Sequence, residues 1–407
     1  MNCRFCNKEL KYLLISLGLT PLANSYLSRE QLSRNEPFFP LEVYICENCF
    51  LVQLPEFESP ENIFSDYAYF SSYSDIWLKH AKDYVKKMIK LFGIDKRSYV
   101  VEIASNDGYL LQYFKEKGIP VLGIEPARNV AEAALEKGIP TEIMFFGTKT
   151  AKEMAGQGRY ADLLVGNNVL AHVPGLNDFV TGLKIILKPS GVITMEFPHL
   201  MRLIEGVQFD TIYHEHFSYF SFLTVENIFS GNGLQIFDVE ELPTHGGSLR
   251  IYAKHKEDKT KDVSSRVDGL RAREINSGYK DMKFYLGFVE KVIKVKKDIL
   301  TLLTQIKEKG KTIVGYGAPA KGNTLLNYCG INTDSIEYTV DRNPHKQGRY
   351  LPGSRIPIES VEKIKLTKPD YLFILPWNLK DEIVDQMSYI REWGGNFIVP
   401  IPEPKIF

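Results

Sequence analysis

The sequence lacks the features that would place it in a membrane, outside the cell or on nucleic acid. Its 407 residues contain no apolar run near the length of about 20 residues that a membrane-spanning helix needs. The opening residues Met1-Asn2-Cys3-Arg4 lack the apolar core of a signal peptide. Fifty Lys and Arg residues balance fifty Asp and Glu residues, so no long-range field attracts nucleic acid or an anionic membrane. We therefore expect a cytoplasmic, monomeric protein that has neither nucleic acid nor a membrane as a partner.

Cysteine is scarce, and its number is odd. Five cysteines argue against a disulfide framework in a secreted protein. Four of them form two pairs, Cys3-x-x-Cys6 and Cys46-x-x-Cys49, and each pair can present two thiolates to one tetrahedral zinc ion. Since four thiolates leave no position for a catalytic water, the spacing predicts a structural zinc site. The alternative is four free, buried cysteines; the fifth, Cys329, is expected to lie in the core.

The length suits two or three domains. Residues 1–72 are rich in short strands, Pro and Cys and are expected to form the zinc-binding domain. Residues 73–260 begin with a helical pattern from Ser74 to Gly93 and continue as short apolar runs that alternate with helical stretches, which is typical of a parallel, doubly wound α/β sheet. Residues 261–407 are expected to form a long helical spacer over 267–309 and a second, smaller Rossmann-like unit.

The apolar runs and turn residues give the expected elements. Strands are expected at Tyr99–Ala104, Pro120–Ile124, Ala161–Gly166, Gly191–Phe197, Thr312–Tyr316, Ile336–Val340 and Tyr371–Leu375. Helices are expected at Gly108–Lys117, Asn129–Lys137, Lys321–Cys329 and Asp381–Glu392. In a doubly wound sheet, ligands bind beyond the carboxyl ends of the strands, so residues that follow these strands are the first candidates for a site.

Polar side chains follow three strands of the first sheet. The candidate cofactor-binding residues lie at these strand ends. They are Glu102, Ala104, Ser105, Asn106, Asp107 and Gly108 around the first loop, Glu125 and Pro126 after the second strand, and Asn167 and Asn168 after the third. An acidic residue at the position of Glu125 can accept hydrogen bonds from both ribose hydroxyls. On spacing alone, NAD and S-adenosylmethionine remain open, as does a turn without cofactor. The loop lacks the GxGxxG glycines, which weakens the case for a pyrophosphate.

A dense cluster of titratable groups lies at residues 210–219. Tyr213, His214, Glu215 and His216 are consecutive, and histidine is the natural base near neutral pH. The spacing of His214 and His216 suits one face of a strand, whereas no HExxH-like pattern for a helical zinc site is present. The residues alone leave a base, a structural hydrogen-bond cluster and a second metal site open.

The second Rossmann-like unit opens with a glycine-rich loop between a strand and a helix. Gly315, Gly317, Ala318, Lys321 and Asn323 are its candidate substrate-binding residues. Backbone amides at a helix N-terminus beside a lysine can hold a phosphate. A purely structural turn is the alternative.

Five segments occur together in one order: the four cysteines, the loop at 103–110, the cluster at 213–219, the segment His245-Gly246-Gly247-Ser248-Leu249-Arg250 and the loop at 315–327. In this combination the chain resembles the zinc-containing, S-adenosylmethionine-dependent sugar 3-C-methyltransferases of deoxysugar biosynthesis, over essentially its full length. The resemblance implies an N-terminal zinc-binding domain, a class I methyltransferase Rossmann-like domain and a C-terminal Rossmann-like domain that helps hold a nucleotide sugar.

The resemblance also implies a reaction and its residues. Members of the family transfer a methyl group from S-adenosylmethionine to the carbon beside the ketone, position 3, of a nucleotide-linked 4-keto-6-deoxy sugar. His216 matches the position of the base, with Tyr213 and Glu215 beside it, and Tyr67 and His172 match further active-site positions. His214 is expected to contact substrate. The nucleotide, TDP or GDP, and the sugar epimer stay open.

The chemistry is compatible with these residues. An imidazole can remove a proton next to a ketone if hydrogen bonds, for example from tyrosine hydroxyls, stabilise the enolate oxygen. Two other classes of function remain as alternatives. One is an NAD-dependent nucleotide-sugar oxidoreductase that uses the glycine-rich loop for its cofactor, and the other is a zinc-ribbon binding module without enzymatic activity.

Overall fold

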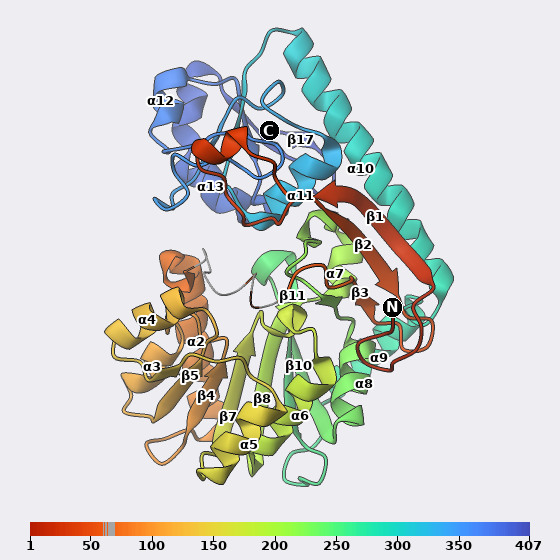
Figure 1. The fold of residues 1–407 in the computed structure, drawn as a ribbon, viewed down its shortest axis with the longest axis vertical. Helices are drawn as coiled ribbons and strands as arrows, with labels where there is room; N and C mark the ends of the chain where they lie inside the picture. The colour runs from red at the N-terminus through yellow and green to blue at the C-terminus, as the bar shows by residue number, and fades with distance from the viewer. Residues whose placement is uncertain (60, 62, 64–69) are drawn as a thin grey trace.

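The computed structural model describes residues 1–59, 61, 63 and 70–407. Its strands form three sheets of seven, six and four strands. Figure 1 shows the seven-stranded sheet at the lower end of the molecule, the six-stranded sheet at the upper end, and the four-stranded sheet beside the long helix that connects them. This α/β architecture confirms the predicted fold class.

The seven-stranded sheet is doubly wound. Its strand order is β10-β11-β8-β7-β4-β5-β6. All strands are parallel except β11, which runs antiparallel between β8 and β10. The strands are β4 Val100–Ile103, β5 Val121–Ile124, β6 Thr141–Glu142, β7 Ala161–Asn167, β8 Leu187–Pro198, β10 Leu234–Leu242 and β11 Ser248–His255. The chain passes from β4 outward to β5 and β6 and returns on the other side at β7, so a crevice opens at the carboxyl ends of β4 and β7.

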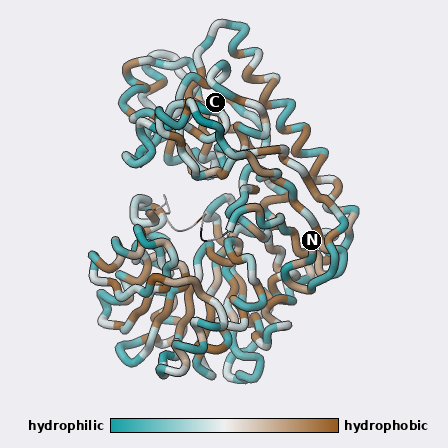
Figure 2. Tube along the Cα trace, in the orientation of Figure 1, coloured by the Kyte–Doolittle hydropathy of each residue, from teal (hydrophilic) through white to brown (hydrophobic). Residues whose placement is uncertain are grey.

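The helices of this unit cover both faces of the sheet. They are α2 Asp75–Phe92, α3 Leu111–Lys115, α4 Arg128–Glu136, α5 Thr148–Gly156, α6 Leu176–Ile186, α7 Leu200–Glu205 and α8 Phe222–Gly231. Helix α2 forms where the periodicity predicts it: the Ser74 side chain accepts a hydrogen bond from the Trp77 N–H, and Gly93 ends the helix at φ 63°. The central strands are buried on both faces, which explains their continuous apolar runs (Figure 2).

The four-stranded sheet contains β1 Tyr12–Thr20, β2 Phe39–Ile45, β3 Val52–Gln53 and, from far along the chain, β9 Ser218–Tyr219. Between β1 and β2 the chain leaves this sheet and reaches the upper unit (Figure 1). There Leu27 pairs with Tyr350, and the Glu36 side chain accepts a hydrogen bond from the Gly353 N–H. The N-terminal segment therefore contacts both larger units.

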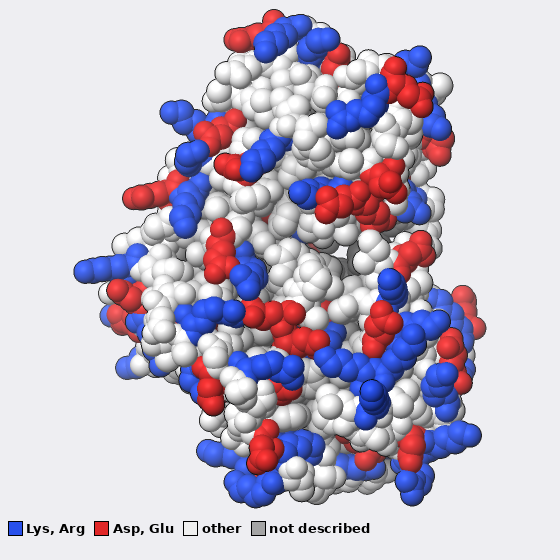
Figure 3. Space-filling model, turned by 180° about the vertical axis from the view of Figure 1, so that it is seen from behind, with Lys and Arg blue, Asp and Glu red and all other residues white. Residues whose placement is uncertain are grey.

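The expected spacer consists of two helices, α9 Ser265–Asn276 and α10 Met282–Glu308. The helical pattern is interrupted because Gly278 adopts φ 96° and the Asp281 side chain caps a new helix by accepting from the Lys283 N–H. Charged residues of both signs are interspersed over the face seen in Figure 3, in keeping with their equal totals. Among the helices that the structure describes, none has the combined length and hydropathy needed to cross a bilayer.

The six-stranded sheet has the order β14-β13-β12-β15-β16-β17. Its strands are β12 Ile313–Tyr316, β13 Thr339–Val340, β14 Ile358–Glu359, β15 Tyr371–Ile374, β16 Asn396–Val399 and β17 Lys405–Ile406, and its helices are α11 Ala320–Cys329, α12 Lys363–Thr367 and α13 Lys380–Gln386. The five strands before β17 are parallel, as predicted for a Rossmann-like unit. The expected helix at Asp381–Glu392 is wrong in its second half, which is a 3-10 helix over Ser388–Trp393.

Candidate active site

The four paired cysteines form one cluster in the N-terminal domain. All four sulfur atoms lie within 4.8 Å of one another, and the Cys3–Cys49 and Cys6–Cys46 sulfur pairs are each 3.5 Å apart. A tetrahedral zinc ion with Zn–S bonds of about 2.3 Å separates its sulfur ligands by roughly 3.8 Å. The donor set and its spacing therefore fit one zinc ion.

The two CxxC turns have the same backbone geometry. The Cys3 carbonyl accepts from the N–H of Asn7, which has φ 59°, and the Cys46 carbonyl accepts from the N–H of Phe50, which also has φ 59°. The repeated turn aims both pairs of thiols at one point. With four protein ligands the zinc is structural, as the sequence predicted.

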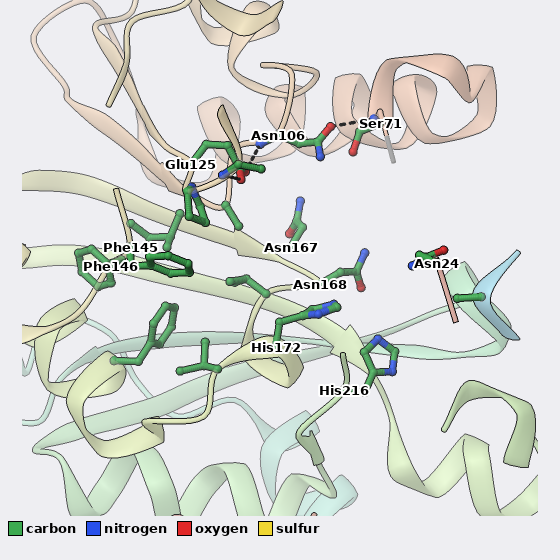
Figure 4. A pocket seen from close by; sticks show the side chains of 18 of the residues that line it. Asn24, Ser71, Asn106, Glu125, Phe145, Phe146, Asn167, Asn168, His172 and His216 are labelled. Atoms are coloured by element: carbon green, nitrogen blue, oxygen red, sulfur yellow. Dashed lines mark hydrogen bonds between the residues drawn. The ribbon is translucent and has the colours of Figure 1, made fainter. Parts of the chain in front are cut away.

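A cavity of about 520 Å³ opens at the carboxyl edge of the seven-stranded sheet, where the crevice was expected. The walls come from all three parts of the chain: loops after β4, β5 and β7, Asn24 from the N-terminal segment, and Pro319, Ala320, Lys321 and Lys346 from the C-terminal unit. Figure 4 shows Asn106, Glu125, Asn167, Asn168, His172 and His216 along it.

The Glu125 carboxylate is held at the end of β5 by two backbone N–H groups. Its Oε2 accepts from the Asn106 N–H and its Oε1 from the Ala127 N–H, both at 2.9 Å. Burial raises the pKa of Glu125 to about 7, and the two hydrogen bonds oppose that shift. A carboxylate offers about four acceptor sites, so Glu125 can still accept from the hydroxyls of a ribose.

The remainder of this end of the cavity suits the other parts of S-adenosylmethionine. Met144, Phe145, Phe146 and Phe179 form an apolar, largely aromatic wall suited to a flat base. Apart from this aromatic wall, the side-chain oxygens of Asn167 and Asn168 are buried and accept no hydrogen bond from the described residues. Buried polar atoms normally have partners, so these two oxygens are suited to a bound ammonium group. The residues present at this end of the cavity therefore suit the methyl donor.

Six of the predicted cofactor residues line the cavity, namely Ala104, Asn106, Glu125, Pro126, Asn167 and Asn168. The other four lie behind it. Glu102 is fully buried within β4, where burial raises its pKa well above the ordinary value, and Ser105 packs against Gly123. Asp107 accepts hydrogen bonds from the Ser72 N–H and Lys137, and Gly108 has φ 75°. These four residues belong to the strand and loop that carry Ala104 and Asn106.

His216 lies in a turn that follows the short 3-10 helix Phe209–Thr211. Its Nδ1–H donates to the Thr211 carbonyl at 3.0 Å. Because that carbonyl can only accept, the neutral ring keeps its lone pair on Nε2. Burial is the main cause that holds the pKa of His216 well below its usual value, and His172, His245 and Lys321 lower it further. The ring is thus neutral and packs against the Tyr213 ring, with centroids 4.0 Å apart and the planes tilted by 34°.

His172 stands at the end of the loop after β7 and faces His216. The ring centroids are 4.8 Å apart with the planes at 75°. Burial lowers the pKa of His172 to about 4, although an interaction with the Glu215 backbone opposes this shift. Both histidines line the cavity, so the structure brings the two predicted histidines together.

Glu215 is buried beside the cavity and does not line it. Its Oε1 accepts from Asn24 Nδ2 at 2.6 Å. Burial raises the pKa of Glu215 to about 7, while Asn24 and Lys346 lower it. Lys346 in turn donates to the Ala318 carbonyl. This cluster joins the three parts of the chain at one wall.

The expectation that His214 shares a strand face with His216 is wrong. Residues 213–216 form a turn, in which the His216 N–H donates to the Tyr213 carbonyl. His214 consequently points away from the cavity, where its Nε2–H donates to the Pro40 carbonyl and its ring packs edge-on against Phe39 and Phe57. Tyr67 lies outside the described residues.

Of the five candidates in the C-terminal glycine-rich loop, only Lys321 lines the cavity. Its Nζ donates to Asn378 Oδ1 and lies 4.5 Å from the centre of the Trp377 ring. Burial lowers the pKa of Lys321, and Asp210 raises it. Lys321 thus reaches the cavity from the C-terminal unit, in contact with Asn378 and Trp377.

The other four candidates of this loop do not line the cavity. Gly315 is inside β12 against Thr339, and Gly317 at φ 87° packs on Pro376. The Ala318 carbonyl accepts from the Tyr26 hydroxyl, and Asn323 Nδ2 donates to the Ala23 carbonyl. Through these two hydrogen bonds the loop and the start of α11 hold the N-terminal segment against the C-terminal unit. A strand–loop–helix motif does not reveal such a contact.

The cavity residues that were not predicted include four polar or aromatic ones from distant parts of the chain: Asn24, Trp77, His245 and Lys346. Asn24 and Lys346 belong to no recognisable motif. His245 was noted only as part of a glycine-rich segment. Two glycines after a histidine are a usable signal, because they indicate a tight backbone path beside a titratable group.

The doubly wound sheet with this cavity and the four-thiol cluster defines a zinc-containing, S-adenosylmethionine-dependent methyltransferase. Comparisons with known proteins agree: models for a zinc-binding domain, a methyltransferase domain and a C-methyltransferase C-terminal domain match residues 3–64, 77–239 and 243–402. The C-methyltransferase NovU of Streptomyces niveus is 36% identical over 404 residues, which cover 99% of this chain and 96% of NovU. The chain therefore belongs to this family of C-methyltransferases.

Solved structures resemble part of the chain. An S-adenosylmethionine-dependent methyltransferase from Clostridium acetobutylicum matches 44% of this chain and 92% of its own length, with 10% identity and a TM-score of 0.35. One from Archaeoglobus fulgidus matches 44% of this chain and 94% of its own length, with 15% identity and a TM-score of 0.35. The family assignment does not depend on these partial similarities.

Proposed function

We propose that this C-methyltransferase methylates position 3, the carbon beside the ketone, of a nucleotide-linked 4-keto-6-deoxy sugar, through an enolate. The observation that carries the proposal is the neutral His216 ring in the cavity, with Nδ1–H fixed on the Thr211 carbonyl and Nε2 left as a base. S-Adenosylmethionine supplies the methyl group as an electrophile on a sulfonium. The chain itself must convert the carbon at position 3 of the sugar into a nucleophile by removing its proton.

His216 acts as the general base. Its Nε2 takes the proton from position 3, and the electron pair of that C–H bond becomes the enolate, with negative charge on the ketone oxygen. Contacts with the Tyr213 ring and the His172 ring hold the His216 ring in place. General-base catalysis by a positioned side chain contributes about two to four powers of ten in rate.

The transfer step balances without an added acid or oxidant. The enolate electron pair forms the new carbon–carbon bond as the carbon–sulfur bond breaks, and the sulfur leaves as a neutral thioether. The ketone re-forms, and His216 returns its proton to solvent. The cavity walls supply the alignment that this displacement needs, and Tyr67 or Tyr213 is proposed to donate to the enolate oxygen.

The nucleotide end of the substrate is proposed to lie against the C-terminal unit. Lys321 and Lys346 both line that wall, and two ammonium groups suit a diphosphate. Glu215 keeps Asn24 at the same wall through its 2.6 Å hydrogen bond. TDP and GDP sugars are both compatible with this arrangement.

The direct test is mass spectrometry of products from S-adenosylmethionine and a panel of TDP- and GDP-4-keto-6-deoxy sugars. A gain of one methyl group is expected with one nucleotide series, and NMR should place it at position 3. His216→Ala should lose about two to four powers of ten in kcat. Wild-type enzyme that methylates none of the panel would contradict the proposal. The NAD-dependent oxidoreductase alternative has no support from the comparisons; binding of NADH in calorimetry would revive it.

A further inference from the structure

His245 lines the catalytic cavity, although it belongs to neither the cofactor loops nor the cluster around His216. It follows β10 in the short 3-10 helix Thr244–Gly246, on the same sheet edge. Lys321 lowers the pKa values of both His216 and His245, and His245 lowers that of His216. These three groups therefore surround one part of the cavity.

The tautomer of His245 is fixed by its neighbour. Asn168 Nδ2 lies 3.1 Å from His245 Nε2. Since an amide nitrogen can only donate, Nε2 accepts, and the neutral ring carries its proton on Nδ1. No residue that the structure describes accepts a hydrogen bond from this Nδ1–H.

The backbone at His245 is strained and is held in place from several sides. His245 has φ 54° and ψ 21°, a left-handed conformation that few residues other than glycine adopt. The two residues that follow have no room for a side chain: a Cβ on Gly246 would lie 2.6 Å from Trp377, and one on Gly247 would lie 2.5 Å from Arg202. Strain of this kind is retained where the surrounding structure has a use for it.

A buried ion network supports the loop from below. Thr244 donates to Glu196 Oε1, and Arg250 and His80 are bonded to Glu196 Oε2. Trp77 packs on both His80 and His245, with ring centroids at 4.9 and 5.2 Å. The His245 ring is thus fixed before substrate arrives, as a group that must act on developing charge should be.

We propose that His245 is a catalytic residue whose neutral imidazole donates its Nδ1–H to the oxygen that becomes negative when His216 removes the proton. The inference rests on the proposed function, because it needs an enolate-forming substrate. Burial lowers the pKa of His245 to about 4; Lys321 and His80 lower it further, and Glu196 opposes them. The ring therefore stays neutral at the working pH, and a neutral imidazole with a lowered pKa is a known electrophile for enolates.

His245→Gly and His245→Asn test the inference as a pair. Glycine tolerates the left-handed backbone, so His245→Gly removes the imidazole without added strain. Asparagine also tolerates this conformation and keeps an N–H donor. Loss of one oxyanion donor costs about 100- to 1,000-fold in kcat, so His245→Gly should show that loss while calorimetry finds S-adenosylmethionine affinity nearly unchanged. His245→Asn should retain more activity, and added imidazole should partly restore His245→Gly.

A second readout follows the proton. Wild-type enzyme without methyl donor should exchange the hydrogen at position 3 with deuterated water, and His245→Gly should slow this exchange as it slows turnover. Unchanged kcat in His245→Gly, or a loss confined to S-adenosylmethionine affinity, would overturn the role of His245 and leave the proposed function intact. Wild-type enzyme inactive on every keto sugar would overturn both.

Discussion

The imidazole rings of His172 and His216 meet edge to face with their centroids 4.8 Å apart, and both line the cavity at the carboxyl edge of the sheet. Two imidazolium ions cannot be stable at that distance in a buried site, because each charge would raise the free energy of the other. Both pKa values lie below the usual value of 6.5, that of His172 at about 4.

NMR titration of the histidine ring resonances should therefore show His172 and His216 neutral through pH 6.5. When folding lowers the pKa of a histidine, the folded protein binds fewer protons than the unfolded protein at any pH between the pKa values of the two states. The free energy of unfolding therefore carries no penalty from His172 above about pH 6.5, and it decreases as the pH falls from 6.5 toward 4. His172→Ala identifies the signals, and a midpoint near 6.5 for either ring would contradict the prediction.

Glu125→Ala should weaken the binding of S-adenosylmethionine and leave nucleotide-sugar affinity nearly unchanged. Loss of a charged hydrogen-bond acceptor costs about 1.5–3 kcal/mol, or roughly ten- to a hundredfold in affinity. Calorimetry measures both affinities. Since burial raises the pKa of Glu125 to about 7, wild-type affinity should also decrease below that pH, and this decrease should be absent from Glu125→Ala. Unaltered cofactor affinity in the variant would place the ribose elsewhere.

Lys321→Ala should raise KM for the nucleotide sugar more than it lowers kcat, because the lysine is proposed to bind diphosphate and not to react. Asn323→Ala is the matched control two residues further along α11. It removes a buried hydrogen bond to the Ala23 carbonyl, which should cost about 1–3 kcal/mol of stability and lower Tm with little change in KM. The opposite pattern at Lys321 would indicate a lysine that takes part in the reaction.

Purified protein that has not met a chelator should hold about one zinc ion per chain with four sulfur ligands, as X-ray absorption can show. Cys3→Ser should lose the metal and lower Tm. Cys329→Ser is the control, since Cys329 lies in the core and outside the four-thiol cluster. Metal analysis that finds no zinc in untreated protein would refute the assignment.

The sequence was informative wherever a local pattern decides the structure. The CxxC spacing gave the thiol cluster, and Ser74 and Gly93 gave the ends of α2. The alternation of strands and helices predicts a parallel sheet, in which all strands end at the same edge. Asn106, Glu125 and Asn168 follow such strands and therefore lie together at that carboxyl edge.

Tertiary contacts decided the rest. His214 turned outward because residues 213–216 form a turn, and nothing in their order distinguishes a turn from a strand. Asn24 reaches the site through a bond to Glu215, 191 residues away. No pattern within one segment could have predicted that contact.

The short strand β9 has a consequence for the order in which the protein forms. Val52 of β3 pairs with Tyr219 of β9, 167 residues further along the chain, so the sheet next to the zinc cluster stays incomplete until that stretch has been made. At about 5–20 residues per second, a ribosome needs roughly 10–30 s for that stretch. During this interval β3 has an open edge, and open strand edges can pair with other chains. Production at lower temperature, or with a chaperone that shields nascent strands, should therefore raise the yield of folded enzyme.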